Sequence, residues 1–162
     1  MQYFILVIIF FKFSIVLAED SLLIFECGGH INANEGFSMP EEKKFSIFTS
    51  KQTCKDNMAN IATLSCFGAF ETKESKVSEM FAACEMKYQD GSRGWIRAKR
   101  ETEISAGVGN FTFIAGEGKF SKLVGVSCPY AIQYIDSSNF SILKCRVSKE
   151  TIEHIKHSTL EE

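Results

Sequence analysis

The sequence has no excess of positive charge and no long apolar run beyond its first 18 residues. Its 18 Lys and Arg residues are outnumbered by 20 Asp and Glu residues, which gives a net charge of −2. Nucleic-acid-binding domains usually concentrate basic residues on one face, so we expect no nucleic-acid partner. A membrane-spanning helix needs about 20 consecutive apolar residues, so we expect no membrane span in residues 19–162.

The motifs of the common chemistries are absent as well. No C-x-x-C occurs, which argues against a zinc site, and no G-x-S-x-G occurs, which argues against a serine hydrolase. Of the three histidines, His30 lies in a stretch with the composition of a loop, and His154 and His157 lie near the C-terminus. We interpret all of them as surface residues, and we predict no metal site, no cofactor and no catalytic residue.

One stretch resembles a nucleotide-binding loop, namely AGEGKFSKLVG at residues 115–125. A Walker loop follows G-x-x-x-x-G-K-[ST], which would require Gly at position 113 and Ser or Thr at position 120. Phenylalanine occupies both positions, and the residues that follow alternate like a strand and show no helical period. We therefore interpret the stretch as a turn between two strands, with Gly116 and Gly118 at the corner and Lys119 in solvent.

The N-terminus has the features of an export signal. Residues 1–18 are almost wholly apolar and end in Val16-Leu17-Ala18, whose small residues fit a signal-peptidase site. Lys12 interrupts the apolar run, and a lysine in so short a segment disfavours the alternative of an uncleaved membrane anchor. We predict a signal peptide at 1–18, cleavage after Ala18, and an exported protein that is either secreted or periplasmic.

Alternation of apolar and polar residues predicts strands along the rest of the chain. The candidate strands are residues 22–28, 44–50, 63–70, 78–88, 95–103, 107–114, 126–134 and 140–147. Residues 51–61 are expected to form a loop or a short helix, and residues 97–103 to form the solvated end of a hairpin. Seven or eight strands at this spacing predict an all-β sandwich or barrel. We expect a disulfide-linked barrel domain at 19–148 and a C-terminal helix or tail at 149–162.

All six cysteines follow the predicted signal peptide. An even number of cysteines in an exported chain indicates disulfides, for which 15 pairings exist. Strand register selects one of them: if Tyr134 faces Asn139 across a short loop, Cys128 lies opposite Cys145 on the same face. Pro129 places this first strand at a sheet edge or near a strand start, because proline cannot donate a ladder hydrogen bond.

The other two pairings are less constrained by the sequence. If residues 63–70 and 78–86 form a hairpin with a loop near 73–78, Cys66 lies opposite Cys84. Cys27 and Cys54 then remain for each other.

Inward-facing aromatic and sulfur-containing side chains are the best candidates for a ligand cavity. The candidate residues are Met86, Trp95, Tyr130 and Tyr134. The alternative is that these side chains fill the core, because small barrels are usually packed with side chains. Asn110-Phe-Thr and Asn139-Phe-Ser match the glycosylation sequon, which is relevant only in a eukaryotic source.

The stretch GEGKFSKLVG also carries a family resemblance. The pattern G-x-G-K-[F/Y]-x-x-[I/L]-x-G is matched by Gly116, Gly118, Lys119, Phe120, Leu123 and Gly125. It resembles the calycin-like barrels related to allene oxide cyclase and dirigent proteins, and is most similar to small exported bacterial proteins of uncharacterised function. The resemblance covers residues 107–147 and implies a single antiparallel up-and-down barrel of about eight strands, whose interior takes an apolar molecule without a cofactor. It identifies no catalytic residue, and the six cysteines depart from the plant pattern.

Three functions remain open at this point. The first is a non-enzymatic binding or interaction module, with a small apolar molecule as its possible partner. The second is a cofactor-independent cyclase or isomerase, as the resemblance would imply. The third is a secreted inhibitor or surface structural protein with a solid core. A cavity of about 300 Å³ or more would favour the first two.

Overall fold

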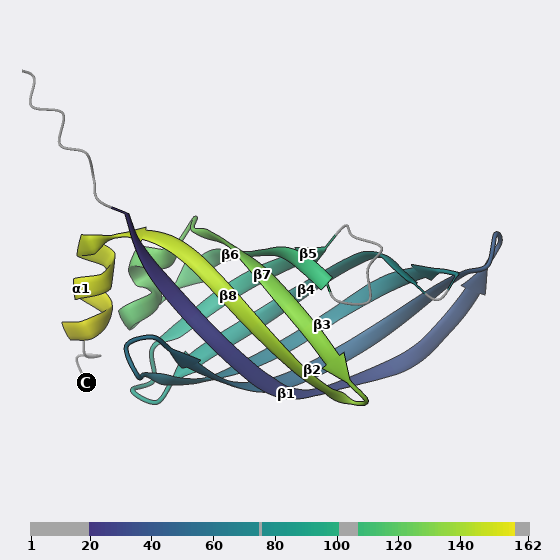
Figure 1. Ribbon diagram of the computed structural model, residues 1–162, viewed down its shortest axis with the longest axis horizontal. Helices are drawn as coiled ribbons and strands as arrows, with labels where there is room; N and C mark the ends of the chain where they lie inside the picture. The colour runs from purple at the N-terminus through teal and green to yellow at the C-terminus, as the bar shows by residue number, and fades with distance from the viewer. Residues whose placement is uncertain (1–19, 75, 101–106, 158–162) are drawn as a thin grey trace, which may run out of the picture.

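The structure, a computed structural model, describes residues 20–74, 76–100 and 107–157. The described residues form a closed antiparallel barrel in which each of eight strands pairs with the next along the chain and the last pairs with the first (Figure 1). The strands are β1 (Asp20–Met39), β2 (Lys43–Asp56), β3 (Ile61–Lys73), β4 (Lys76–Tyr88), β5 (Arg93–Arg100), β6 (Gly107–Gly116), β7 (Ser127–Ile135) and β8 (Ser138–Ser148). The predicted up-and-down barrel is confirmed, and the predicted signal peptide lies outside the described residues.

Strand alternation produces the barrel interior. In β8, for example, Leu143, Cys145 and Val147 are buried, whereas Lys144 and Arg146 between them are exposed. Successive side chains of a strand point to opposite faces, so this pattern closes one face around a core and leaves the other in water. The largest fully buried side chains include Phe25, Leu64, Met86, Ile96 and Phe113.

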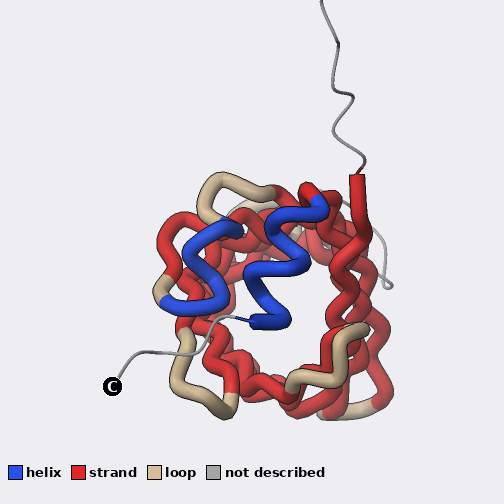
Figure 2. Tube along the Cα trace, turned by 90° about the vertical axis from the view of Figure 1, so that its left-hand side faces the viewer, coloured by secondary structure: helices blue, strands red, loops and turns tan. Residues whose placement is uncertain are grey.

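Two short helices cover one end of the barrel (Figure 2). The 3-10 helix η1 (Gly118–Leu123) connects β6 to β7, and the helix α1 (Lys149–His157) follows β8. Ile155 on α1 is fully buried, and the backbone N–H of Thr151 donates a hydrogen bond of 3.1 Å to the Ser148 hydroxyl. A serine hydroxyl that accepts such a bond is a typical N-cap. The helix predicted after Ser148 is confirmed by α1.

Three disulfides join neighbouring strands in pairs. They link Cys27 to Cys54 between β1 and β2, Cys66 to Cys84 between β3 and β4, and Cys128 to Cys145 between β7 and β8. All three predicted pairings are confirmed. The register used to predict the last one is also observed, because Tyr134 lies opposite Asn139 and Tyr130 opposite Leu143. Of the two positions predicted for Pro129, the structure shows the one near a strand start, because Pro129 lies near the beginning of β7. A sheet edge is not available in a closed barrel.

Several local predictions are wrong. The loop or short helix expected at 51–61 is instead the continuation of β2 to Asp56, a short connection and the start of β3. Polar side chains at Gln52 and Asp56 are buried there, so the inward face carries no apolar pattern by which to recognise a strand. His30 lies within β1 and not in a loop, although it is exposed as expected.

The connection between two strands predicted at 115–125 is confirmed, because this stretch links β6 to β7, but it contains the 3-10 helix η1, which the sequence did not predict. Phe120 and Leu123 are both fully buried, since η1 turns these two side chains toward the core. Gly118 has a φ of 58°, as predicted for a corner glycine. Gly116 has a different role: a Cβ atom at this position would overlap the backbone of Phe120.

Candidate functional site

A cavity of about 260 Å³ lies inside the barrel, in the half remote from the two helices. The Cys66–Cys84 disulfide and small side chains, among them Ala82 and Ala98, form part of its lining. Its walls are formed by Ile31, Ala33, Phe48, Ser50, Gln52, Phe70, Lys76, Val77, Met80, Arg100, Phe111, Tyr130, Ile132, Tyr134 and Ser141. Most of these side chains are apolar, so the cavity suits an apolar molecule.

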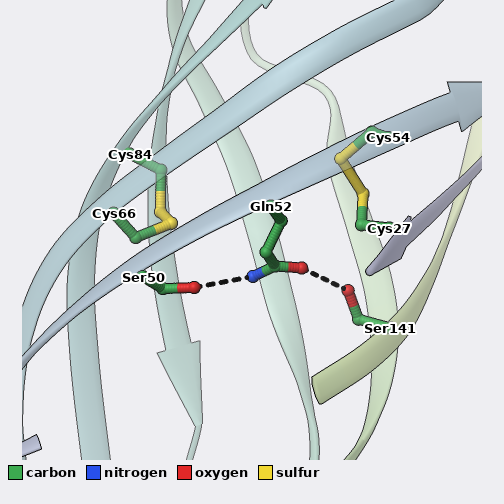
Figure 3. The surroundings of a disulfide bond; sticks show 7 residues. All are labelled: Cys27, Ser50, Gln52, Cys54, Cys66, Cys84 and Ser141. Carbon is green, nitrogen blue, oxygen red and sulfur yellow. Dashed lines mark hydrogen bonds between the residues drawn. A yellow bond between two sulfur atoms is a disulfide. The ribbon is translucent and has the colours of Figure 1, made fainter. Parts of the chain in front are cut away.

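One wall of the cavity carries a hydrogen-bonded polar strip (Figure 3). The side-chain amide of Gln52 donates to the Ser50 hydroxyl at 3.0 Å, and its oxygen accepts from the Ser141 hydroxyl at 3.2 Å. Gln52 lies between the Cys27–Cys54 and Cys66–Cys84 disulfides in this view. These three buried side chains are hydrogen-bonded to one another, so no ligand is needed to supply hydrogen-bond partners for this polar strip.

A second polar group comprises Arg100, Tyr130 and Tyr134. The Arg100 side chain is only 2% exposed and is hydrogen-bonded to the side chain of Tyr134. Tyr130 is 3% exposed, and its hydroxyl has no hydrogen-bond partner among the described residues. Buried hydroxyls normally have a partner, so the Tyr130 hydroxyl has unused capacity to bind a polar atom inside the cavity.

Burial controls the protonation of both tyrosines. It raises the pKa of Tyr130, and the neighbouring Tyr134 adds to this effect while the Arg100 cation opposes it. Burial likewise raises the pKa of Tyr134, against the opposing charge and hydrogen bond of Arg100. Tyr134 is nevertheless 43% exposed, since it lies toward the end of β7. Both phenols therefore stay neutral near pH 7 and can donate a hydrogen bond.

Two glycines of β6 make room for this polar group. A Cβ atom at Gly107 would overlap the guanidinium of Arg100, and one at Gly109 would overlap the ring of Tyr130. Gly109 lies directly opposite Tyr130 in the β6–β7 ladder. The absence of side chains at these two positions thus lets the Arg100 and Tyr130 side chains lie inside the barrel.

The predicted ligand residues divide into two sets. Tyr130 and Tyr134 line the cavity, as the sequence predicted. Met86 is fully buried in the core but is not among the cavity-lining residues. Trp95 is partly exposed and does not line the cavity, and the Arg93 guanidinium lies 5.5 Å from its ring centre.

Sequence reasoning missed Arg100. The hydrophilic run at 97–103 was interpreted as the solvated end of a hairpin, and this is wrong at Arg100. The signal was present in the alternation of β5, where Gly94, Ile96, Ala98 and Arg100 share one buried face. Residues 101–103 of the predicted solvated end lie outside the described residues.

A different polar network lies at the helix-covered end. Asp56 is buried and accepts from the Tyr88 hydroxyl at 2.6 Å and from the backbone N–H of Met58 at 2.8 Å. The Lys119 ammonium lies 3.0 Å from Asp90 and donates to Asn60, so the prediction that Lys119 points into solvent is wrong.

Ionisation in this network is controlled by burial and by neighbours. Burial raises the pKa of Tyr88, and its hydrogen bond to Asp56 raises it further. Partial burial acts to raise the pKa of Asp90, but hydrogen bonds from Ser92 and Lys119 outweigh it and hold this pKa below its usual value. Through these bonds the network holds together the loops at this end of the barrel.

The C-terminal helix is fixed by one of the predicted surface histidines. The Nε2 atom of His154 lies 3.1 Å from both the Ser121 hydroxyl and the carbonyl oxygen of Gly118. His154 therefore connects α1 to η1. His157 is largely exposed beside Glu153, with which it forms a 3.3 Å contact.

The two predicted glycosylation sequons differ in accessibility. Asn110 is exposed on β6, whereas Asn139 is buried inside the barrel. Neither side-chain polar atom of Asn139 has a hydrogen-bond partner within the described chain.

Among the residues described by the structure, no group of three or more His, Cys, Asp or Glu side chains is arranged to hold a metal ion. Within the same residues, no helix is long and apolar enough to cross a membrane. No protein-family model, curated protein or solved structure matches the chain.

Proposed function

We propose that this protein is an exported, non-enzymatic β-barrel that binds a small apolar ligand in its interior. The observation that carries the proposal is the cavity of about 260 Å³ in a barrel whose other half is packed with side chains. This volume is below the roughly 300 Å³ expected above for a ligand site, which is the lower end of the range for drug-sized ligands, so the proposal is limited to a smaller ligand. An apolar cavity of about 150 Å³ already binds benzene, which places a ligand of one ring or a short hydrocarbon chain within its capacity.

The disulfides support the export part of the proposal. Three disulfides with no free cysteine in the described chain are typical of an oxidising compartment, because cytosolic thiols are kept reduced. The apolar segment at 1–18 supplies the corresponding signal. The compartment is therefore proposed to be extracellular or periplasmic.

Binding is better supported than catalysis. A general acid or base works best with a pKa near the operating pH. Burial instead moves the pKa of Tyr130 and of Tyr134 further above neutrality. These phenols suit hydrogen-bond donation to a bound molecule better than proton transfer, so the cyclase or isomerase implied by the family resemblance is the less favoured hypothesis.

Native mass spectrometry of protein purified from its source tests the proposal most simply. We expect a co-purifying molecule of low mass that is released when the barrel is unfolded. Two variants supply a matched comparison, because Ala82 lines the cavity whereas Ala83 is exposed on the same strand. Ala82→Phe should lose the molecule, and Ala83→Phe should retain it. A molecule that remains on Ala82→Phe would place the binding site elsewhere and contradict the proposal.

A further inference from the structure

We propose that the ligand carries a carboxylate, which the Arg100 guanidinium and the Tyr130 hydroxyl bind, while its apolar part extends toward the Cys66–Cys84 disulfide. This inference rests on the proposed function, because it assigns the chemical class of the molecule bound in the same cavity. Three independent features of the cavity support it.

The first feature is the sign of the charge. Arg100 and Lys76 are the cationic side chains of the cavity wall, and no Asp or Glu is among its described lining residues. The two cations differ in position, since Arg100 is buried and Lys76 is exposed. Arginine keeps its charge at all ordinary pH values, and electrostatic attraction is stronger inside a protein than in water. The described part of the cavity wall therefore presents positively charged and no negatively charged side chains to a bound molecule.

The second feature is the unused hydrogen-bond donor. The Tyr130 hydroxyl is buried in the cavity wall, lacks a partner in the described chain, and stays protonated near neutral pH. A carboxylate is a hydrogen-bond acceptor with two oxygens, and its shape matches the planar fork of a guanidinium. It can accept from Arg100 through one or both oxygens and from Tyr130 as well. A phenol and a guanidinium together thus form a donor set suited to a carboxylate.

The third feature is the way in which the site is built. Gly107 and Gly109 leave the space that the Arg100 and Tyr130 side chains occupy inside the barrel. The hydrogen bond between Arg100 and Tyr134 restrains the guanidinium further. The Arg100 and Tyr130 side chains are thus already ordered before a ligand binds. Binding therefore costs little additional side-chain entropy. Tyr134 acts here as a positioning residue for Arg100.

The polar and apolar parts of the cavity are arranged for an amphipathic molecule. Ala82, Ala98 and the Cys66–Cys84 disulfide line it together with Phe48 and Phe111. A short hydrocarbon chain or a single ring can be buried against these groups while its carboxylate reaches Arg100. The volume of about 260 Å³ is compatible with a monocarboxylic acid of about eight carbons, judged against the 150 Å³ that holds benzene.

The test compares octanoate with octan-1-ol, which share a chain and differ in the head group. Isothermal titration calorimetry of the disulfide-bonded protein should show octanoate binding at least about tenfold more tightly, because hydrogen bonds to charged groups are the stronger ones. If octan-1-ol binds as tightly as octanoate, the carboxylate inference is overturned and the proposed function stands. If neither compound binds, the proposed function fails, and the inference fails with it.

Variants assign the effect to the named side chains. Arg100→Gln should weaken octanoate binding by about 10- to 100-fold. Octan-1-ol binding should change by less than about twofold. Arg97→Gln is the matched control, since Arg97 is exposed on the same strand and its loss removes the same charge. Equal losses of octanoate affinity in both variants would show that only overall charge matters and would overturn the proposal.

Tyr130→Phe keeps the test decisive if Arg100→Gln does not fold. This substitution removes only a hydroxyl that makes no hydrogen bond within the described chain, so folding should be preserved. We expect octanoate affinity to fall about tenfold and octan-1-ol affinity to stay within about twofold. Unchanged octanoate affinity in Tyr130→Phe would overturn the role assigned to this hydroxyl.

Discussion

The hydrogen bond between Tyr88 and Asp56 gives a prediction whose size and pH dependence follow from the structure. Tyr88 on β4 donates to the carboxylate of Asp56 at the end of β2, with 2.6 Å between the two oxygens. Both residues are buried. Tyr88→Phe removes this bond but retains the ring, which stacks on Phe120 with 4.5 Å between ring centres. The variant therefore isolates the hydroxyl.

The expected loss of stability is that of one hydrogen bond to a charged acceptor. Such bonds contribute about 1.5–3 kcal/mol, so the free energy of unfolding at pH 7 should fall by that amount. Asp56 retains three donors in the variant, namely the backbone N–H groups of Met58 and Asn60 and the side-chain amide of Asn60. The carboxylate thus remains paired, and the loss should not reach the larger cost of an orphaned buried charge.

Alkaline pH supplies a second, independent readout. The folded protein holds the pKa of Tyr88 above its ordinary value because of burial and the bond to Asp56. The stability that this provides is fully present below the unfolded pKa of about 10 and is lost as pH rises above it, because the unfolded chain releases the proton first. The contribution falls by about 1.4 kcal/mol per pH unit above pH 10. Tyr88→Phe lacks this contribution.

Urea unfolding followed by circular dichroism at several pH values measures both effects. The stability difference between the wild type and Tyr88→Phe should be constant from pH 7 to about pH 9 and should shrink by about 1.4 kcal/mol by about pH 11. A difference that stays constant across this range would refute the reasoning, because Tyr88 would then titrate alike in both states. A loss below about 0.5 kcal/mol at pH 7 would show that the bond is not formed in solution.

Three further variants test other parts of the fold. Replacing Cys128 and Cys145 together by Ala should lower the free energy of unfolding by about 3 kcal/mol, the value for a loop of this length, as measured by urea unfolding. Ile155→Ala should cost about 2–5 kcal/mol, because the side chain is fully buried under α1, and hydrogen exchange should report opening of that helix. Gly109→Ala should destabilise the protein by about 1–3 kcal/mol through overlap with the Lys99 backbone oxygen and the Tyr130 ring, detectable as a lower Tm; an unchanged Tm would contradict the close packing around Gly109.

Sequence alternation was sufficient to predict the β7–β8 hairpin. The inward face is apolar along β7 and in the second half of β8, and the register that places Tyr130 opposite Leu143 also aligns Cys128 with Cys145. A one-residue slip would turn every inward side chain outward, which is why the register is strongly specified where one face is buried.

Alternation failed where the barrel interior is polar. Ser50 and Gln52 face inward and hydrogen-bond to one another, so β2 has no apolar inward pattern in this part. Arg100 was missed for the same reason, because a buried arginine in a hydrophilic run has the composition of a solvated turn. Interior polar residues are specified by partners on other strands, and a single sequence does not show those partners.

The predicted ligand residues show the same limit. Side-chain type correctly indicated Tyr130 and Tyr134 as cavity-lining residues. It did not separate them from Met86, which packs in the filled half, or from Trp95, which lies on the other face of β5 from Ile96. The position of a side chain along the barrel axis depends on the stagger of all eight strands, which local alternation does not determine.

The most direct test of a ligand site inside the barrel is a two-dimensional NMR titration of the isotope-labelled, disulfide-bonded protein with octanoate. Binding in the cavity predicts saturable shifts of backbone amides at Ala82, Ala98 and Phe111, which line it on three neighbouring strands. The outer surface offers an alternative site, because Phe67 and Phe81 are exposed by 68% and 54% on the opposite face of β3 and β4. Shifts confined to Phe67, Phe81 and their neighbours, with the cavity amides unchanged, would contradict the account.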